Sequence, residues 1–545
     1  MKKMMITAAT ALMLAPAAHS QSAIDALQVA EPSFSGTARF MGMGGAFTAL
    51  GGDLSAVGQN PAGIGIYRHS EIGATLGIDI MGTKTESPAS SYSKSKTKAA
   101  CNNFGYIGVA NLNSTMQTFA WGASYNRVSQ FDRVMHGYTP SNFNNQSLTN
   151  YIANFTTVAG FKDSELNFGE DYNPYINGSA DWLSILAYNS YLINNQPNST
   201  NSYNGLYNGN TVGDAMLDVH EKGYVDEYRF NFGGNIANTV YWGLGIGVTD
   251  LSYTRETTYS ESMENASAMS GPAGGVVNNA DAGYYLDNYK HLDGTGWNIS
   301  FGLIFKPVNE LRIGAAIHSP TYWSIDHNYQ GSVDYSFDDA NYAPGDNNPL
   351  SGNEQTDYAG FSWRLKSPWR FNVGVAGVIG NSAIISLDYE RVAYNDMTIK
   401  NAVYDNYGYI GGYDDNEYMN QDIRNYTKGG NILRVGAEYR VTPQFSLRAG
   451  YNYETSNTKD EAADGNLEVV TSGTDPSYSF NKSTQNITFG MGYRVSNWSF
   501  DAAYVHGMRK STLHAYTNYE GAMNSPKYDV TNNTNSIVLS VGFRF

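Results

Sequence analysis

Apolar side chains of adaptable shape gather in a glycine-rich stretch near the start of the chain. The stretch spans residues 36–65 and reads GTARFMGMGGAFTALGGDLSAVGQNPAGIG. Methionine and phenylalanine adapt to apolar molecules of varied shape, so these residues favour the binding of a hydrophobic compound. We predict that the ligand-facing side chains are Phe34, Phe40, Met41, Met43, Phe47 and Leu50. The alternative is that the same side chains pack this stretch against the remainder of the protein.

The glycines of this stretch do not make a phosphate-binding loop. Gly42, Gly44 and Gly45 lack the spacing of the dinucleotide-binding motif, and no predicted strand precedes them. Asn60 and Pro61 stand near the end of the stretch, and we interpret them as residues that fix its last turn. We therefore predict no nucleotide and no other cofactor.

The reactive side chains lack the partners that catalysis or metal binding requires. No Gly-x-Ser-x-Gly motif in a strand-turn-helix setting is present, so we predict no catalytic residue and no enzyme activity. Cys101 is the only cysteine, which excludes an intramolecular disulfide, and we interpret it as an inert thiol. The acidic run Asp414-Asp415-Asn416-Glu417 offers oxygen ligands for calcium but lacks the EF-hand pattern. We interpret this run as a solvated loop and predict no metal site.

The histidines are the residues that a haem receptor would use as axial ligands. They show no pair at close spacing on one strand face, and they include His69, His136, His220, His291, His318, His327 and His506. His318 and His327 face opposite ways if their strand is regular. A receptor for haem or another nutrient thus stays an alternative without support from these residues. A surface adhesin or assembly scaffold, with loops rich in tyrosine and asparagine, is a third hypothesis.

The composition favours a membrane barrel over a soluble core. The 545 residues include 42 tyrosines and 57 glycines, 13% are aromatic and only 15% are charged. Low charge with abundant aromatic and glycine residues is typical of outer membrane barrels. The net charge of −16 argues against a nucleic acid partner, because binding through phosphates requires cations.

The first twenty residues have the pattern of a secretory signal peptide. Lys2 and Lys3 precede an apolar run from Ile6 to Ala18, and small residues at Ala18 and Ser20 suit a cleavage site. No later stretch supplies the roughly twenty apolar residues that a spanning helix needs, and the mean hydropathy is −0.40. An exported chain of this kind would cross a membrane as strands.

The C-terminal residues 536–545 alternate between apolar and small or polar side chains. An outer membrane barrel closes on its last strand, and its outer face must be apolar to contact lipid. The residues on the apolar face are Ile537, Leu539, Val541, Phe543 and Phe545. The same two-residue period recurs in the runs 433–440 and 445–454, which a short turn joins. Charges of both signs occupy the opposite face of these runs, as expected for a watery lumen.

We predict about fourteen strands, an even number as in single-chain barrels. They span Arg68–Gly82, Asn103–Ala110, Thr115–Phe131, Tyr224–Asn235, Val240–Tyr259, Gly296–Lys306, Leu311–Tyr329, Ser362–Val378, Ala383–Tyr394, Ile432–Arg440, Phe445–Glu454, Asn486–Val495, Trp498–His506 and Ile537–Phe545. Every second connection is a tight turn, at 111–114, 236–239, 307–310, 379–382, 442–444 and 496–497. The other connections are long and polar, which places the short turns in the periplasm and the long loops outside.

Two local features modify this pattern. The connection 136–221 is too long to be structureless, and its segments 147–158 and 181–193 have helical spacing. These helices either pack over the barrel mouth or form a capture site for a hydrophobic ligand. Within 240–259 the apolar residues change face around Thr249 and Asp250, which indicates a bulge or, as we favour, the point where the strand leaves the membrane.

The residues before the first strand are suited to fill the lumen. A glycine-rich apolar segment ahead of a barrel wide enough to be a pore can fold inside it and plug it. We therefore predict a signal peptide at 1–20, an N-terminal hatch at 21–67 and an all-β transmembrane barrel at 68–545, with 136–221 as a long external loop.

Several motifs match a known family. The runs Gly44–Phe47, Asp53–Ala56 and Asn60–Gly63 resemble the N-terminal hatch of the FadL-type outer membrane transporters of long-chain fatty acids and other hydrophobic compounds. Asn60-Pro61-Ala62 is the most specific part of this hatch motif. The run Lys222–Tyr228 is similar to the Bacteroidetes branch of the family. The resemblance continues through the runs 320–322, 367–369, 387–389 and 432–453.

The resemblance implies a fourteen-stranded antiparallel barrel with an internal hatch, in agreement with the strand count. It also implies passive uptake of a hydrophobic compound such as a long-chain fatty acid, after which the hatch shifts and releases the ligand, sideways into the membrane as one route. The expected location is the outer membrane, and the expected partners are its lipid and lipopolysaccharide. We expect a monomer. Residues 136–221 do not align with the ligand-capture loops of the family, so the sequence does not identify the substrate.

Overall fold

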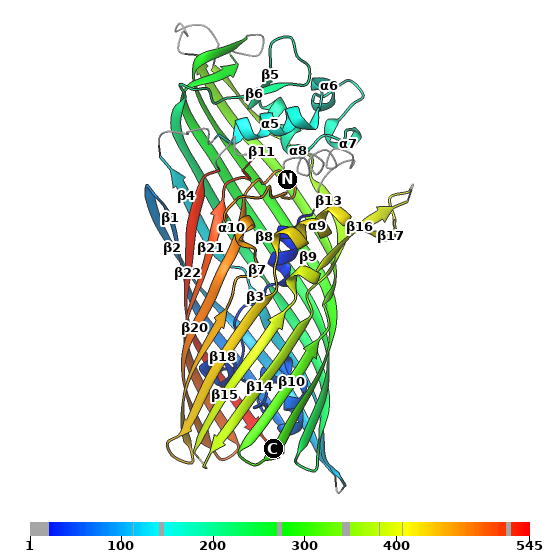
Figure 1. Ribbon diagram of the computed structural model, residues 1–545, viewed down its shortest axis with the longest axis vertical. Coiled ribbons are helices and arrows are strands. Elements are labelled where there is room, and N and C mark those ends of the chain that lie inside the picture. The colour runs from blue at the N-terminus through cyan, green and yellow to red at the C-terminus, as the bar shows by residue number, and fades with distance from the viewer. Residues whose placement is uncertain are drawn as a thin grey trace, which may run out of the picture.

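The polypeptide forms a closed antiparallel barrel with its N-terminal segment inside (Figure 1). A computed structural model describes residues 21–112, 114–140, 147–269, 275–339, 349–380, 382–405, 407–518 and 525–545. The predicted signal peptide lies outside the described residues and stays a prediction. None of the helices in the described ranges has both the length and the hydrophobicity that a membrane crossing needs.

The wall has fourteen strand positions, which confirms the predicted number. Four positions consist of two segments in line, separated by a short break. In order, the wall contains β1 (Glu71–Ser87), β2 (Ser90–Asn111), β3 (Met116–Gln130) with β4 (Arg133–Thr139), β7 (Val212–Ile236), β8 (Val240–Met269), β9 (Val276–Val308), β10 (Leu311–His318) with β11 (Tyr322–Asp339), β13 (Ala359–Lys366) with β14 (Arg370–Ile379), β15 (Ala383–Val392) with β16 (Thr398–Tyr404), β18 (Gly430–Arg440), β19 (Phe445–Glu454), β20 (Tyr478–Val495), β21 (Trp498–His514) and β22 (Lys527–Arg544).

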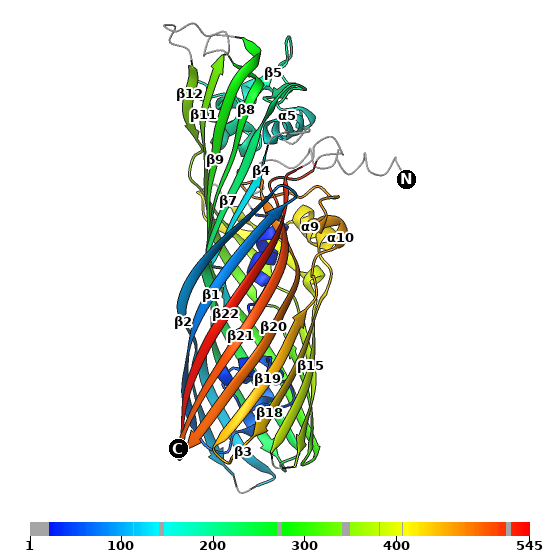
Figure 2. The same cartoon turned by 90° about the vertical axis from the view of Figure 1, so that its left-hand side faces the viewer.

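The last strand closes the barrel, as its alternation predicts. β22 pairs with β21 on one side and with β1 on the other, where Ile78 lies opposite Ile537. Leu539 is 54% exposed on the outer face, whereas its neighbour Val538 is fully buried inside. The predicted tight turns separate the paired strands at the end of the barrel that holds the C-terminus (Figure 2).

Two belts of exposed aromatic side chains mark the membrane boundaries. Apolar side chains such as Leu244, Ile246 and Phe301 cover the outer surface between the belts. Aromatic rings at both interfaces of an apolar band are typical of outer membrane barrels. The belt near the tight turns includes Tyr439, Tyr493, Trp498 and Phe545, and the outer belt includes Tyr228, Trp297, Tyr322 and Tyr389.

The outer parts of β7, β8, β9 and β11 extend far beyond the outer belt and carry a helical cap (Figure 1). The predicted helices are confirmed as α5 (Leu148–Ala159), which Ser147 caps, and α8 (Trp182–Asn189), which Asp181 caps. Their apolar sides pack on the inward faces of β7, β8, β9 and β11 in one buried cluster. Because β4 and β7 continue past the expected limits, the external connection is shorter than predicted. The cap also contains α6 (Asp163–Leu166), α7 (Pro174–Asn177), β5 (Ile193–Asn195), β6 (Tyr203–Gly205) and β12 (Pro349–Gln355).

The change of apolar face in β8 has no bulge at Thr249 or Asp250. β8 pairs with β9 in unbroken register from Val240 to Met263. Val248 is exposed to the membrane, whereas Leu251 is buried inside the barrel. The strand therefore leaves the membrane at this level, as we favoured.

The N-terminal segment, residues 21–67, occupies the lumen in two parts. Helix α2 (Ala23–Ala30) lies in the outer half, where Ser22 and Asp25 form a capping box. The lower part contains α3 (Ala38–Gly42), α4 (Ala56–Gln59) and the 3-10 helix η2 (Pro61–Ile66), near the tight turns (Figure 2). The remaining elements are η3 (Tyr394–Asp396), β17 (Ile410–Asp415), α9 (Glu417–Tyr426) and α10 (Asp460–Ala463), of which α9 and α10 share a buried cluster with α2.

Candidate functional site

Glycines on the inward face of the wall let the lower N-terminal segment contact the wall backbone. Gly436 and Gly450 lie opposite each other on β18 and β19 and face Met43 and Gly44. A β-carbon at Gly450 would overlap the Gly44 nitrogen, and one at Gly44 would lie 2.7 Å from the Tyr451 nitrogen. Gly44 also has a positive φ of 61°, which favours glycine. The space between the segment and the wall therefore admits no side chain larger than glycine at Gly44, Gly436 and Gly450.

Polar contacts anchor the same segment to the wall. The Thr48 N–H donates to Asp388 at 2.7 Å, and Arg39 forms an ion pair with Glu438 at 3.1 Å. The Asn60 side-chain oxygen accepts from the Ala62 N–H at 3.0 Å, which caps η2, and Pro61 occupies its first position. These contacts hold the hatch motif in a fixed turn.

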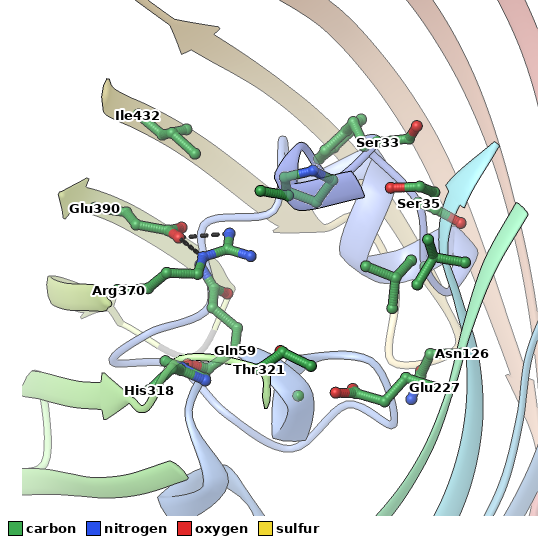
Figure 3. Close-up of a pocket in the computed structure, with 18 of the residues that line it drawn as sticks. Ser33, Ser35, Gln59, Asn126, Glu227, His318, Thr321, Arg370, Glu390 and Ile432 are labelled. Atoms are coloured by element: carbon green, nitrogen blue, oxygen red, sulfur yellow. Dashed lines mark hydrogen bonds and ion pairs between the residues drawn. The ribbon is translucent and has the colours of Figure 1, made fainter. Parts of the chain in front are cut away.

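A cavity of about 250 Å³ lies above the anchored part of the segment (Figure 3). Phe34, Phe40 and Gln59 of the N-terminal segment line it on one side. The opposing wall is polar, and Figure 3 shows Arg370 and Glu390 joined across it. We call this space the central chamber.

Ion pairs neutralise most of the charge on the chamber wall. Glu390 lies between Arg370 and Arg434, at 2.6 Å from the Arg434 guanidinium. Glu227 accepts two hydrogen bonds from Arg229, each at 2.8 Å. Paired charges of this kind form a polar surface without a strong net field.

A second cavity of about 170 Å³ shares Phe34 with the central chamber. Its other apolar lining includes Met41, Met81, Phe131 and Met508. We call it the side chamber. The two chambers also share Ser33, Ser35 and Arg127, so they adjoin each other around the segment that holds Phe34.

The side chamber adjoins a stretch of wall that lacks backbone pairing. The β2–β3 ladder ends at Asn103 and Asn126, although β2 continues to Ser90 along β1 and β4 continues to Thr139 along β7. We call the unpaired stretch between residues 90–102 and 127–139 the seam.

Side chains close the seam where backbone hydrogen bonds do not. Lys96 forms an ion pair with Asp132 at 2.6 Å, and Lys98 pairs with the same carboxylate. At the outer end, the Ser90 hydroxyl donates to the Tyr138 carbonyl at 2.7 Å. Breaking these side-chain contacts costs less free energy than breaking a continuous ladder of backbone hydrogen bonds.

The structure distributes the predicted ligand-facing residues between two environments. Phe34, Phe40 and Met41 line the chambers. The other three, Met43, Phe47 and Leu50, are buried between the N-terminal segment and the wall. Their roles toward a ligand stay predictions. The polar side chains of the chamber wall carry no sequence motif, and only the alternation of their strands indicates that they face inward.

His318 and His327 do not lie on one regular strand, so the condition under which they would face opposite ways is not met. The wall breaks at 319–321, between β10 and β11, and both side chains lie inside the barrel. A regular strand would place residues nine apart on opposite faces. The break shifts the alternation of inward and outward side chains, so both histidines face inward. His318 hydrogen-bonds to the Gln59 carbonyl at 2.8 Å. Burial lowers the pKa of His327 to about 3, so this imidazole is neutral at physiological pH.

An ion pair holds α2 in the outer lumen. The Lys290 ammonium donates to Asp25 at 2.6 Å, and both side chains are shielded from solvent. Burial by itself would raise the pKa of Asp25, but Lys290 holds this pKa well below its usual range. Within the described residues, no three His, Cys, Asp or Glu side chains are grouped so as to hold a metal ion.

Comparison with known proteins gives one family match. Residues 220–545, more than half of the chain, match the family described as outer membrane protein transport protein (OMPP1/FadL/TodX). No curated protein matches significantly.

Several solved structures are similar over most of the chain. A Pseudomonas aeruginosa FadL homologue is 14% identical, with a TM-score of 0.48, over 94% of this chain and 99% of that chain. The P. putida toluene transporter TodX is 13% identical, with a TM-score of 0.47 and the same coverage. The Ralstonia pickettii toluene transporter TbuX is 15% identical, with a TM-score of 0.42, over 94% of this chain and 98% of that chain.

Proposed function

The chain belongs to the outer membrane protein transport protein family (OMPP1/FadL/TodX), and from this premise we propose that it takes up hydrophobic compounds such as long-chain fatty acids. It resides in the outer membrane. Passage is passive, and the lumen supplies the route. We further propose that the protein has no enzyme activity and acts as a monomer in contact with membrane lipid and lipopolysaccharide.

The two chambers beside Phe34 are the observation that carries this proposal. A hydrophobic molecule gains roughly 25 cal/mol per Å² of apolar area removed from water. Phe34, Phe40 and Met41 offer such area, and Met81, Phe131 and Met508 add to it in the side chamber. An amphipathic molecule can therefore place its apolar part on these side chains while its polar end faces the chamber wall.

The contacts of the hatch and the seam support a sideways exit. A path toward the tight turns would require displacement of the N-terminal segment from the wall glycines and from Asp388. A path from the side chamber crosses the seam, where the ion pairs of Asp132 and other side-chain contacts take the place of a backbone ladder. The outward residues Leu76, Ile78 and Ile80 of β1 are apolar and exposed next to the seam. A hydrophobic cargo that leaves there would enter the membrane directly.

A binding assay with oleate tests this proposal. We expect Phe34→Asp and Phe40→Asp to weaken binding by about tenfold or more, because a carboxylate in the chamber removes apolar contact and repels the oleate headgroup. Met43→Asp separates ligand contact from packing, because Met43 is buried outside both chambers. Tyr358→Asp is the control, since Tyr358 is 60% exposed in the outer region. Unchanged oleate binding in both Phe34→Asp and Phe40→Asp would contradict the assignment.

A further inference from the structure

The outer surface of the barrel has a basic pocket at the level of the outer aromatic belt. Its volume is about 620 Å³, and it lies over β8, β9, β11, β13 and β16. The breaks between β10 and β11, between β13 and β14 and between β15 and β16 lie at this level. Its charged and aromatic rim faces outward, through Trp297, Tyr322 and Arg364, whereas its floor includes the buried Trp323, which also lines the central chamber. We call it the interfacial pocket.

Strand register places the side chains of the interfacial pocket in two rows. The lower row runs from Val248 through Trp297 and Tyr322 to Lys366 on neighbouring strands. The rings of Trp297 and Tyr322 lie 4.9 Å apart and are about half exposed. This row continues the apolar band of the barrel, so it lies against the outer ends of lipid chains.

The upper row is two residues farther from the membrane centre and is cationic. Ser324, Arg364 and Lys400 lie side by side on β11, β13 and β16. Together with Lys366, the pocket therefore has three cationic side chains directly above an aromatic edge. This basic surface stands out in a chain with 34 Lys and Arg against 50 Asp and Glu.

The cations of the interfacial pocket are poorly neutralised. Lys400 pairs with Asp415 at 3.1 Å, but both side chains are about half exposed. The Arg364 guanidinium stacks on the Tyr413 ring at 3.9 Å. In the part of the chain that the structure describes, neither Arg364 nor Lys366 forms an ion pair. Asp250 lies in the same row beyond Ser324, at the far end from Lys400.

We propose that the interfacial pocket binds the phosphorylated headgroup of an outer-leaflet glycolipid, the lipid A part of lipopolysaccharide. The phosphate lies among Arg364, Lys366 and Lys400, because arginine and lysine are strong phosphate partners. The upper part of an acyl chain lies on Val248, Trp297 and Tyr322. A free phosphate would use only the cations, whereas the adjoining exposed apolar row matches an amphipathic lipid.

This inference depends on the placement of the barrel in the outer membrane and not on the identity of the cargo. The cationic side chains of the pocket line neither chamber, so their loss should not change oleate binding in the chambers. Measurement of oleate binding on the same variants therefore distinguishes a failure of this inference from a failure of the proposed function.

Native mass spectrometry of the full-length mature protein in detergent tests the proposal. The probes are phosphorylated lipid A, the same lipid A after enzymatic removal of phosphate, and inorganic phosphate. The triple variant Arg364→Glu, Lys366→Glu, Lys400→Glu is compared with Lys84→Glu, Lys222→Glu, Lys482→Glu, which changes three exposed lysines elsewhere. We expect wild type and the control to retain phosphorylated lipid A, and the pocket variant to lose it by about tenfold or more.

Other outcomes would overturn the proposal. Equal retention of dephosphorylated lipid A would show that phosphate is not recognised. Displacement of lipid A by equimolar inorganic phosphate would indicate a free-anion site. A mobility shift on heating verifies that each variant is a folded barrel, and the triple glutamine variant at the same positions replaces one that fails this check. Full retention by a folded pocket variant would contradict the assignment.

Discussion

Phe34 is the residue on which the two chambers depend. It lines both chambers, and its ring lies 6.2 Å from that of Phe40. The sequence indicated a set of six apolar residues but could not separate those that face a cavity from those that pack. This difference depends on the wall, since Met43 faces Gly436 and Gly450, which are far from it in sequence. The type of a side chain indicates that it makes apolar contacts, but it does not show whether those contacts are with a cavity or with the barrel wall.

We predict that Asp25 holds α2 in the outer lumen at neutral pH and releases it at low pH. Its pKa in the folded protein is below the value of about 3.9 in an unfolded chain. A depressed carboxyl pKa stabilises the docked state above pH 4, and this stabilisation is lost as pH falls through the folded pKa. We expect hydrogen exchange of the α2 amides to show constant protection from pH 8 to pH 5 after correction for intrinsic rates, and weaker protection below pH 4.

Substitution separates the ion pair from simple burial. Asp25→Asn leaves Lys290 buried without its partner, which should destabilise docking by about 3–5 kcal/mol. The double variant Asp25→Asn, Lys290→Met should recover much of this protection, because it removes the unpaired charge. Equal protection of α2 in wild type and Asp25→Asn would contradict the assigned role.

At the scale of elements, close packing against wall glycines holds the lower N-terminal segment. Gly450→Val should displace Met43 and Gly44 from β19, because inserted methyl groups have no space there. We expect the Gly450→Val protein to conduct more ions than wild type in planar bilayers, because the displaced segment no longer fills the lumen. Gly377→Val is the matched control, since a β-carbon at Gly377 on β14 meets no atom within 4 Å. Wild-type conductance in a folded Gly450→Val barrel would show that the segment tolerates this intrusion.

The seam is the element predicted to release cargo. In a Cys101→Ser background, cysteines at Lys98 and Asp132 can be joined by a short bis-maleimide, because these side chains form an ion pair. We expect complete cross-linking to reduce oleate uptake at least several-fold while oleate binding persists.

A cross-link elsewhere controls for general rigidity. Cysteines at Lys428 and Asp460 join the segment before β18 to α10, away from the seam, where the native side chains pair at 3.1 Å. This cross-link should leave uptake unchanged. Full uptake through a barrel with a completely cross-linked seam would exclude the sideways route.

At the scale of the whole molecule, the sequence predicted the membrane part better than the outer part. Lipid requires an apolar outer face, so alternation in residues such as Ile537 and Leu539 identifies each crossing. Beyond the outer belt this requirement ends. β9 begins at Val276, about twenty residues before the predicted strand, because its outer portion is polar and resembles a loop in composition. The length of these strands follows from pairing with β8 and β11, which a single strand does not reveal.

The seam and the break near His318 illustrate the same limit. The seam exists because β2 and β3 stop pairing, and each strand still has a regular partner on its other side. Nothing in residues 90–102 alone indicates which neighbour is missing. His318 and His327 face the same way because three residues, 319–321, fall outside both β10 and β11 and interrupt the alternation of the strand.

Selective uptake of oleate is the most direct test of the central claim that the barrel passes hydrophobic compounds while its N-terminal segment excludes others. Cells that lack their own fatty acid transporter can produce this protein, and entry of radiolabelled oleate can be compared with entry of sucrose. We predict that wild type accelerates oleate entry over the empty host without accelerating sucrose entry, and that Phe34→Asp removes most of the gain. Oleate entry at the rate of the empty host, or equal acceleration of sucrose, would contradict the account.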